Sequence, residues 1–295
     1  MGSRVASNLL AAGYEVAVFN RNRARAEPLV AKGARLALKP CDAAEGAAVA
    51  IALVRDDAAS QEVWLGEAGA LHVLPPSAVA IESSTLSTSW IDRLATKMQA
   101  AAAMFIDVPL IGSRPQAEAK ALIAFAGGDS ETLARVFDIL SVSCATIHHT
   151  GPVGYATALK LAVNGFFATQ VAAMAELAAI SKRHGIEPER SFEIVSGLPT
   201  TSAAAKGAGA LMLANDISPL FPIELVEKDL GYALDAARAH ALEPRVLRSV
   251  HELFAQARRH GFGSANVSAV SAIIDCAATS LSRATGATQA QSALG

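Results

Sequence analysis

Residues 151–164 divide this chain into two parts with different patterns of secondary structure. They read Gly-Pro-Val-Gly-Tyr-Ala-Thr-Ala-Leu-Lys-Leu-Ala-Val-Asn. The Gly151-Pro152 pair is a turn signal in front of a helix, and the helical pattern stays apolar as far as Ile180. Short apolar segments alternate with helical ones before this stretch, and only helical patterns follow it. The stretch therefore marks the junction between two kinds of domain.

The predicted junction helix carries two polar residues on one face. Lys160 comes early in the helix, and Asn164 follows four residues later, so both side chains share a face. A lysine between Leu159 and Leu161 in a buried helix costs free energy unless it has a function. Desolvation lowers the pKa of a lysine and makes it a candidate proton donor and acceptor near neutral pH. A surface lysine on an amphipathic helix gives the same pattern, and these residues alone leave both readings open.

The first part of the chain predicts an α/β fold. Predicted strands and helices alternate there as in a Rossmann-like, doubly wound parallel sheet, and the second part reads as helices alone. The strands are predicted at 15–20, 49–54, 78–82, 105–108, 121–126 and 145–149, with helices at 1–12, 21–32, 57–64, 87–102 and 130–140. The later helices are predicted at 154–184, 188–196, 201–214, 223–240, 243–260 and 268–282. We predict a Rossmann-like domain over 1–151, an all-helical domain over 152–288 and a tail over 289–295.

The composition of the chain argues against some classes of binding partner. The 295 residues suit two domains, and the net charge of −2 gives no basic excess for nucleic acid or an anionic membrane. The N-terminus does not resemble a signal peptide. The apolar run 161–175 is short and interrupted by Asn164 and Gln170, so we read it as a buried helix rather than a membrane span. We therefore expect a cytoplasmic protein with neither nucleic-acid nor membrane partners.

Cysteine and histidine patterns predict no metal site. The three cysteines, Cys41, Cys144 and Cys276, are far apart, which supports neither a disulfide framework nor a zinc site. The pair His148-His149 has no neighbouring carboxylate or cysteine in sequence, and we interpret it as the end of a strand.

The spacing Gly-x-x-Gly-x-x-x-x-x-Lys-Leu-x-x-Asn over 151–164 resembles the catalytic segment of the 3-hydroxyacid dehydrogenases. That family includes 3-hydroxyisobutyrate dehydrogenase, tartronate semialdehyde reductase and the glyoxylate/succinic semialdehyde reductases. In the family the lysine is the general acid/base, and the asparagine helps to place lysine and substrate. The resemblance implies these catalytic roles for Lys160 and Asn164. It also implies a dinucleotide-binding role for the first domain and a substrate-binding and dimerisation role for the second.

The start of the chain departs from the family pattern. A complete fingerprint is a strand, Gly-x-Gly-x-x-Gly and a helix, but here Met1-Gly2 leads directly into a helix. Gly2 matches only the final glycine, which permits tight packing of helix on strand. The strand order 3-2-1-4-5-6 places the first strand in the middle, so the strands at 15–20 and 49–54 are expected to face each other across a gap. We therefore expect an N-terminally truncated member whose natural form begins upstream, with an apolar strand and a glycine loop.

The residues after the strand at 15–20 favour NADP over NAD. Sites that prefer NAD place Asp or Glu there to hold the ribose 2′-hydroxyl. Here Asn20 is followed by Arg21 and Arg23, and arginine suits a 2′-phosphate. The alternative is a solvated basic start to a surface helix, which we favour for Arg25.

The resemblance implies further cofactor contacts. Leu53 and Val54 match the apolar pair over which the nicotinamide side passes, although Arg55 replaces the family's next residue, proline. Thr85 matches the family's Ser-Thr-Val-Ser segment. Without the resemblance, the same residues are equally well interpreted as a cap between a strand and a helix. Phe221 and Lys228 match residues that reach the cofactor in the family. For Lys228 the alternative is a surface ion pair with Glu224 on the same helix.

The substrate segment, residues 107–128, aligns with that of the family without a gap. Ile111 stands where the family has the serine that binds the substrate carboxylate, and Gly112-Ser113 stands where it has a glycine pair. The Ser113 hydroxyl with Arg114 and backbone N–H groups could still bind an anion, whereas Ile111 favours a larger, less polar substrate. Asp229, within the family's Lys-Asp-Leu, is expected at the substrate.

Together these patterns predict an NADP-dependent oxidoreductase acting on a small hydroxyacid or carbonyl substrate. Imine reductases share the architecture but usually have another residue at the lysine position. The alternative is a cofactor-deficient, non-catalytic dimeric relative that acts as a binding or scaffold protein. We expect a homodimer, because a helix that is apolar all round from Leu161 to Ile180 needs cover on every side.

Overall fold

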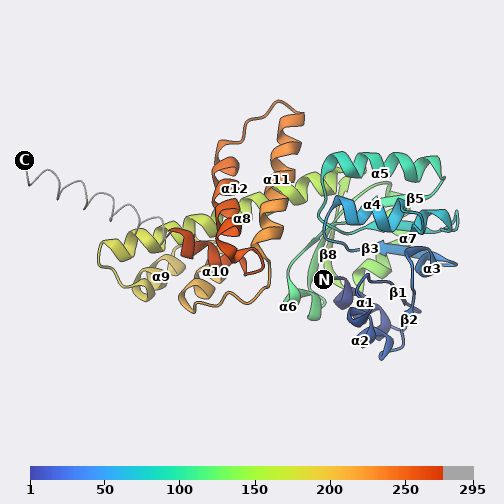
Figure 1. Ribbon diagram of the computed structural model, residues 1–295, viewed down its shortest axis with the longest axis horizontal. Coiled ribbons are helices and arrows are strands. Elements are labelled where there is room, and N and C mark those ends of the chain that lie inside the picture. Colours follow the sequence, from blue (N-terminus) through green and yellow to red (C-terminus); the bar gives the residue numbers. More distant parts are fainter. Residues whose placement is uncertain (275–295) are drawn as a thin grey trace, which may run out of the picture. The chain divides into compact units, whose positions relative to one another are not determined.

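The computed structural model describes residues 1–274, which form two compact units (Figure 1). The first unit comprises residues 1–162, and the second starts at Val163. Helix α8 (Tyr155–Arg183) runs from one unit into the other. Cys276, the tail predicted at 289–295 and the end of the helix predicted at 268–282 lie outside the described residues.

The first unit contains a six-stranded sheet with the order β3-β4-β5-β7-β6, in which β8 also pairs with β7. Its strands are β3 (Val49–Ala52), β4 (Val79–Glu82), β5 (Met104–Asp107), β6 (Leu110–Ile111), β7 (Leu122–Gly127) and β8 (Cys144–Gly151). The first three strands run parallel, as do β7 and β8, whereas β7 is antiparallel to both β5 and β6. The predicted α/β class is confirmed. The reversal at β7 has a physical reason, because a parallel return needs a long crossover and only β6 and a short helix connect β5 to β7.

Strands β1 (Ala17–Val18) and β2 (Arg35–Leu36) form a separate, parallel two-stranded sheet. In the described part of the chain, β1 pairs only with β2, and β3 pairs only with β4. The strands predicted at 15–20 and 49–54 therefore lie in different sheets and share no hydrogen-bonded neighbour.

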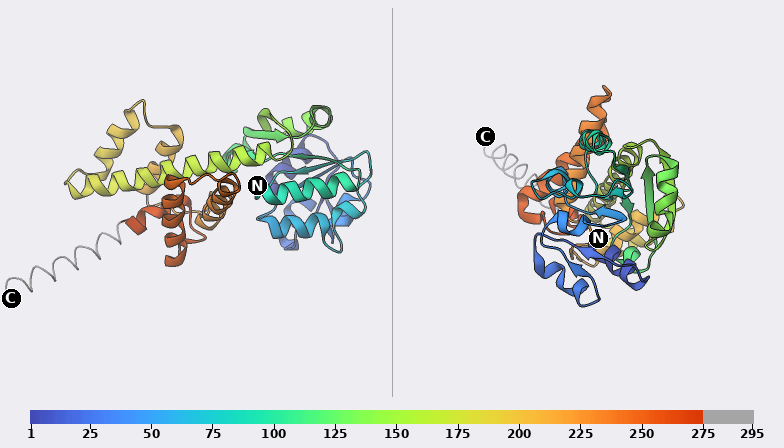
Figure 2. Two further views of the ribbon diagram at one scale, coloured as in Figure 1. Left: turned by 90° about the horizontal axis from the view of Figure 1, so that it is seen from above. Right: turned by 90° about the vertical axis from the view of Figure 1, so that its right-hand side faces the viewer.

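Helices cover both faces of the larger sheet (Figures 1 and 2). On one face, Val5 of α1 packs against a cluster that contains Ile106 and Val136 of α7, and on the other Trp64 of α4 lies in a cluster with Ile91 of α5. Ser87 accepts the N–H of Trp90 and caps α5. The helical elements of this unit are α1 (Gly2–Ala11), η1 (Arg23–Arg25), α2 (Glu27–Val30), α3 (Pro40–Ala44), α4 (Asp57–Leu65), η2 (Ala70–His72), α5 (Thr88–Ala100), α6 (Arg114–Glu118) and α7 (Ser130–Ser141).

The second unit is helical throughout its described residues. After α8 it contains α9 (Pro188–Gly197), α10 (Ala203–Leu213), α11 (Ile223–Ala239), α12 (Arg245–Ala257), η3 (Arg258–Phe262) and η4 (Val267–Ala269). Its core joins Ala168 and Val171 of α8 to Leu230 of α11 and Phe254 of α12. Alanines on α8 let the neighbouring helices approach closely, in keeping with the low aromatic content of the chain.

Helix α8 is buried on one face only. Ala168 and Val171 are fully buried, whereas Phe166 is 68% exposed and Ile180 is 60% exposed. Among the described helices, α8 is the one that is long and apolar enough to cross a membrane by length and composition, and 39% of its most apolar window is buried. Core helices of soluble proteins meet the same criterion, and the alanine-rich face of α8 lies in such a core.

Candidate active site

Lys160 lies in the second turn of α8, and it is buried. Its exposed fraction is 7%, and that of Asn164, four residues further along the same helix, is 8%. The neighbouring Leu161 is 1% exposed, whereas Leu159 is 42% exposed. A lysine on an outer face would not be covered in this way. Burial therefore favours a functional role for Lys160 over a surface position on an amphipathic helix.

Asn164 is held by a short polar network within the helical unit. Its Nδ2 donates to Oδ2 of Asp229 at 2.7 Å, and Oδ1 of Asp229 pairs with Nζ of Lys228 at 2.8 Å. A carboxylate only accepts hydrogen bonds, so Asn164 must direct its NH₂ group to Asp229 and its carbonyl oxygen elsewhere. The ammonium of Lys228 also lies over the ring of Tyr232, 4.7 Å from its centroid. Two residues predicted for the cofactor and substrate, Lys228 and Asp229, thus orient the predicted catalytic asparagine.

Phe221 belongs to the same unit as this network. Its ring stacks on Phe167 of α8 with 6.2 Å between centroids, and its N–H donates to Oδ1 of Asn266. The geometry therefore fixes the backbone and ring of Phe221 directly in front of α11.

The loops after β3 and β4 carry Leu53, Val54 and Thr85, and hydrogen bonds join these loops. The N–H of Val54 donates to Oγ of Ser84 at 2.7 Å. Further along, Ser87 donates through both its N–H and its hydroxyl to the carboxylate of Asp57. The predicted nicotinamide-side residues therefore stand on two loops at the carboxyl ends of adjacent parallel strands, where ligands bind in open α/β sheets.

Glu82, at the end of β4, anchors this pair of loops and was not among the predicted site residues. Its Oε2 accepts from the hydroxyl of Ser60 at 2.6 Å and from Nε1 of Trp64 at 3.0 Å, and its Oε1 accepts the N–H of Ser84 at 2.9 Å. Complete burial raises the pKa of Glu82, and these hydrogen bonds oppose that rise. An acidic residue closing an apolar strand is the sequence feature that could have identified it.

The first turn of α1 packs against the loop after β3. A Cβ on Gly2 would lie 3.3 Å from Cβ of Leu53, so glycine permits the close approach predicted at this position. Helix α1 starts at Gly2, and the positive end of its dipole with its first backbone N–H groups suits the phosphates of a dinucleotide.

Asn20, Arg21 and Arg23 lie in an exposed turn after β1. Oδ1 of Asn20 accepts the N–H of Asn22, and Asn22 in turn caps η1. These two hydrogen bonds shape the turn and leave both arginines at the surface. The residues predicted to bind the dinucleotide therefore lie at the start of α1, in the two loops and in this exposed turn.

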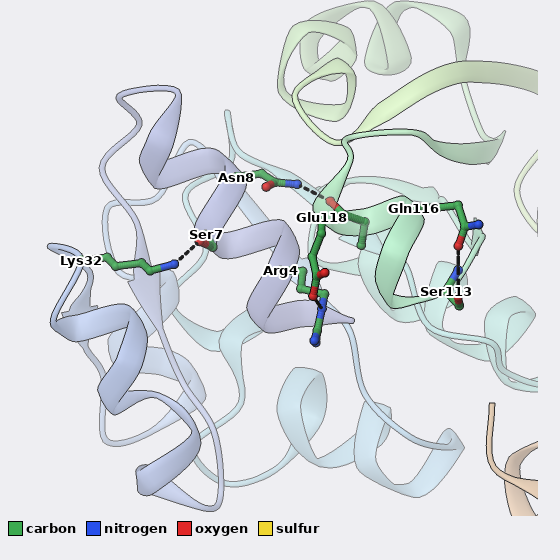
Figure 3. Close-up of polar contacts among 8 residues, drawn as sticks. Arg4, Ser7, Asn8, Lys32, Ser113, Gln116 and Glu118 are labelled. Carbon is green, nitrogen blue, oxygen red and sulfur yellow. Dashed lines mark hydrogen bonds and ion pairs between the residues drawn. The ribbon is translucent and has the colours of Figure 1, made fainter. Parts of the chain in front are cut away.

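The substrate segment is braced by α6 (Figure 3). Ile111 ends β6, Gly112 follows, and Ser113 caps α6. Oε1 of Gln116 accepts both the N–H of Ser113 at 2.9 Å and its hydroxyl at 3.0 Å. Two of the donors predicted to bind an anion, the hydroxyl and the N–H of Ser113, are thus directed to Gln116.

Helix α6 is in turn fastened to α1, as Figure 3 shows. Nε of Arg4 pairs with Oε1 of Glu118 at 2.7 Å, and Nδ2 of the buried Asn8 donates to the carbonyl of residue 117 at 2.9 Å. On the far side of α1, Nζ of Lys32 donates to the Ser7 hydroxyl at 2.8 Å. Contacts between α1 and α6 therefore join the predicted substrate segment to the helix predicted to bind the dinucleotide.

Metal-binding clusters are absent from residues 1–274. Cys41 and Cys144 are free thiols. His148 and His149 lie in β8, where His149 contacts the carbonyl of Gly128, so their placement in a strand is confirmed.

Comparisons with known proteins agree over both units. The sequence profile described as the NAD binding domain of 6-phosphogluconate dehydrogenase matches residues 1–151. The profile described as NAD-binding of NADP-dependent 3-hydroxyisobutyrate dehydrogenase matches residues 154–274. The 3-sulfolactaldehyde reductase of Escherichia coli K12 is 32% identical over 276 residues, which cover 92% of this chain and 91% of that protein.

Solved structures share the fold. The 3-hydroxyisobutyrate dehydrogenase of Mycobacterium tuberculosis with L-serine has a TM-score of 0.85 at 24% identity, covering 93% of this chain and 95% of that one. Psf3 in complex with NADP⁺ and 2-OPP has a TM-score of 0.84 at 22% identity, covering 93% and 96%. The two matching profiles, the similarity to the reductase over nine-tenths of the chain and the shared fold agree. This protein belongs to the 3-hydroxyacid dehydrogenase family and is an NAD(P)-dependent dehydrogenase.

Proposed function

We propose that this protein is an NADP-dependent reductase or dehydrogenase that uses Lys160 as its general acid/base. The observation that carries the proposal is a buried lysine in the second turn of α8 with a buried asparagine on the same face, itself held by Asp229. Lys160 gives a proton to the carbonyl oxygen during reduction or takes it from the alcohol during oxidation. The carbonyl oxygen of Asn164, directed away from Asp229, would accept from the ammonium of Lys160 and so hold the lysine in line with the substrate oxygen.

Bound NAD(P) supplies or accepts the hydride in this chemistry. Gly2, Leu53, Val54 and Thr85 would hold its pyrophosphate and nicotinamide side, because they stand at the start of α1 and on the joined loops after β3 and β4. Arg21 and Arg23 would bind the 2′-phosphate.

The substrate is a small aldehyde or hydroxyacid, and two residues favour a weakly charged one. The related bacterial reductase is named for 3-sulfolactaldehyde, an anionic aldehyde. Here Ile111 replaces a family serine, and Gln116 engages both donors of Ser113. A panel of aldehydes tests the substrate class: glyoxylate, succinic semialdehyde and 3-sulfolactaldehyde as anions, and uncharged alkyl and aryl aldehydes of similar size. We expect NADPH oxidation to be fastest with the uncharged members, and a clear preference for the anions would refute this assignment.

Fluorescence titration of the full chain with NADPH tests whether the cofactor binds, because β1 and β3, which precede residues proposed to hold it, lie in separate sheets. Saturable binding supports the proposal. No binding up to millimolar cofactor would refute it and would leave the non-catalytic binding or scaffold role that the sequence offered as the alternative.

Arg21→Asp is expected to reverse the cofactor preference. The native arginine attracts the 2′-phosphate of NADPH, whereas aspartate repels it and accepts from the 2′-hydroxyl of NADH. Dissociation constants for both cofactors measure the effect. Arg25→Asp makes the same charge change four residues further along and should leave the preference unchanged. Equal affinity of the native chain for the two cofactors would remove the basis of this prediction.

The protein is expected to be a homodimer. The exposed Phe166 and Ile180 on α8 leave a long apolar helix covered on one face only, and a second copy is the proposed cover. Light scattering should give twice the 30.4 kDa mass of one chain, and Phe166→Glu should shift the equilibrium towards monomer. A native mass of one chain across micromolar concentrations would refute the dimer.

A further inference from the structure

Asp107 ends β5 and caps the amino terminus of α8. Its side chain is completely buried. Oδ1 accepts the N–H of Gly154 at 2.8 Å, and Oδ2 accepts the N–H of Thr157 at 2.8 Å and its hydroxyl at 2.7 Å. These donors flank Tyr155, the first residue of α8. One carboxylate from the sheet thus satisfies backbone groups that the first turn of a helix leaves without an intrahelical partner.

The surroundings of Asp107 suit an ionised carboxylate. All three contacts are donors, and a carboxylate is an acceptor only. Its negative charge also lies at the positive end of the α8 dipole. Burial raises the pKa of Asp107, and the hydrogen bonds from Gly154 and Thr157 oppose that rise.

Strand β7 closes the remaining side of this contact. A Cβ on Gly127 would lie 2.4 Å from Oδ1 of Asp107 and 2.9 Å from the carbonyl oxygen of Pro152. Real side chains do not approach so closely, so only glycine fits here. Asp107 is therefore enclosed by β7 and the start of α8.

The cap lies one turn before the proposed catalytic lysine. Lys160 follows Thr157 by three residues, which is a rise of about 4.5 Å along a rigid helix. A helix moves as a unit over such a distance, so the carboxylate that fixes Thr157 also fixes the height and rotation of Lys160. We propose that Asp107 is a positioning residue for Lys160, an inference that rests on the proposed function of that lysine. A reacting group misplaced by about 1 Å can cost on the order of 10²-fold in rate.

Asp107→Asn is the direct test. An amide keeps the size of the side chain, but its NH₂ group is a donor. This group would face one of the donors that the carboxylate now accepts from, so the substitution disrupts the cap. We expect kcat for the most reactive aldehyde of the panel to fall about 10- to 100-fold, with the Kd for NADPH within about twofold of native. Hydrogen exchange of the amides over 154–161 should accelerate in the same variant.

The chain offers a matched control in Asp129, which caps α7. Its Oδ2 accepts the N–H of Thr132 at 2.9 Å and the Thr132 hydroxyl at 3.2 Å, the same pairing of Asp with Thr. Asp129→Asn should leave kcat and the exchange of 154–161 at native values. A fall in kcat as large as that of Asp107→Asn would mean a general loss of stability and would overturn the proposal.

Thr157 keeps the proposal testable if Asp107→Asn does not fold. Thr157→Val removes the hydroxyl bond alone and should lower kcat by several-fold with unchanged NADPH binding, and Thr157→Ser should restore it. If a folded Asp107→Asn or Thr157→Val variant keeps the native kcat while Lys160→Ala is inactive, the positioning role of Asp107 is refuted and the proposed function of Lys160 stands. If the native chain reduces no aldehyde, the proposed function fails instead. The cap is then judged by exchange over 154–161, and unchanged exchange in Asp107→Asn would overturn it.

Discussion

Lys160→Ala is expected to lower turnover by about 10²–10⁴-fold, the usual contribution of a general acid/base. Lys160 is buried in the second turn of α8, and it shares a helix face with Asn164. Its removal takes away the proton that must reach the carbonyl oxygen. The residues proposed to hold the cofactor stand elsewhere, at the start of α1 and in the loops after β3 and β4, so the Kd for NADPH should change little. Steady-state kinetics and NADPH titration measure the two effects.

Lys182 provides the matched control for this substitution. It lies in the last turn of α8, about 33 Å further along the helix. Lys182→Ala removes the same charge from the same helix and should keep native turnover. Near-native turnover of Lys160→Ala on a reducible substrate would show that another group carries the proton.

A strand supplied between β1 and β3 is expected to stabilise the first unit strongly. In the described residues each of these strands pairs on one side only. A strand of about five residues joined to both would add backbone hydrogen bonds worth about 0.5–1.5 kcal/mol each. Since 1 kcal/mol shifts the Tm of such a domain by roughly 2–4 °C, the Tm should rise by roughly 10 °C or more.

This prediction is tested by extending the chain in front of Met1. One extension encodes an apolar strand followed by a Gly-x-Gly loop, and the control has the same length in glycine and serine. Thermal melts with and without NADPH compare the two. The apolar extension should also tighten NADPH binding, because its loop would place N–H groups at the start of α1. Equal Tm and equal affinity for both extensions would show that other groups already satisfy the edges of β1 and β3.

The sequence predicted the long elements of this fold well. Helices α5, α7, α8 and α11 are among the longer helices of the described chain, and each lies within a few residues of its expected bounds. Strand β2, with two residues, and the short α3 were missed, because elements of this length show no periodicity. Helix α6 was missed although Ser113 and Gln116 have the spacing of a capping box, a pattern that sequence inspection could have recognised.

The candidate site was predictable only where it follows local spacing. The shared face of Lys160 and Asn164 follows from their separation on one helix. The contacts that orient them do not, because Asp229 is 65 residues from Asn164 and Asp107 is 50 residues from Thr157. Such pairings depend on how strands and helices pack, and a single sequence carries no local pattern that predicts them.

Transfer of deuterium from NADPH labelled at nicotinamide C4 to the carbonyl carbon of an aldehyde substrate tests the central claim most directly. Mass spectrometry of the alcohols formed from the aldehyde panel makes the measurement, with native protein and Lys160→Ala run in parallel at saturating cofactor. The account predicts one deuterium on the carbinol carbon of at least one product with the native chain, and a rate of labelling lower by about 10²-fold or more with Lys160→Ala. Saturable NADPH binding without label in any product, or equal labelling by both proteins, would contradict it.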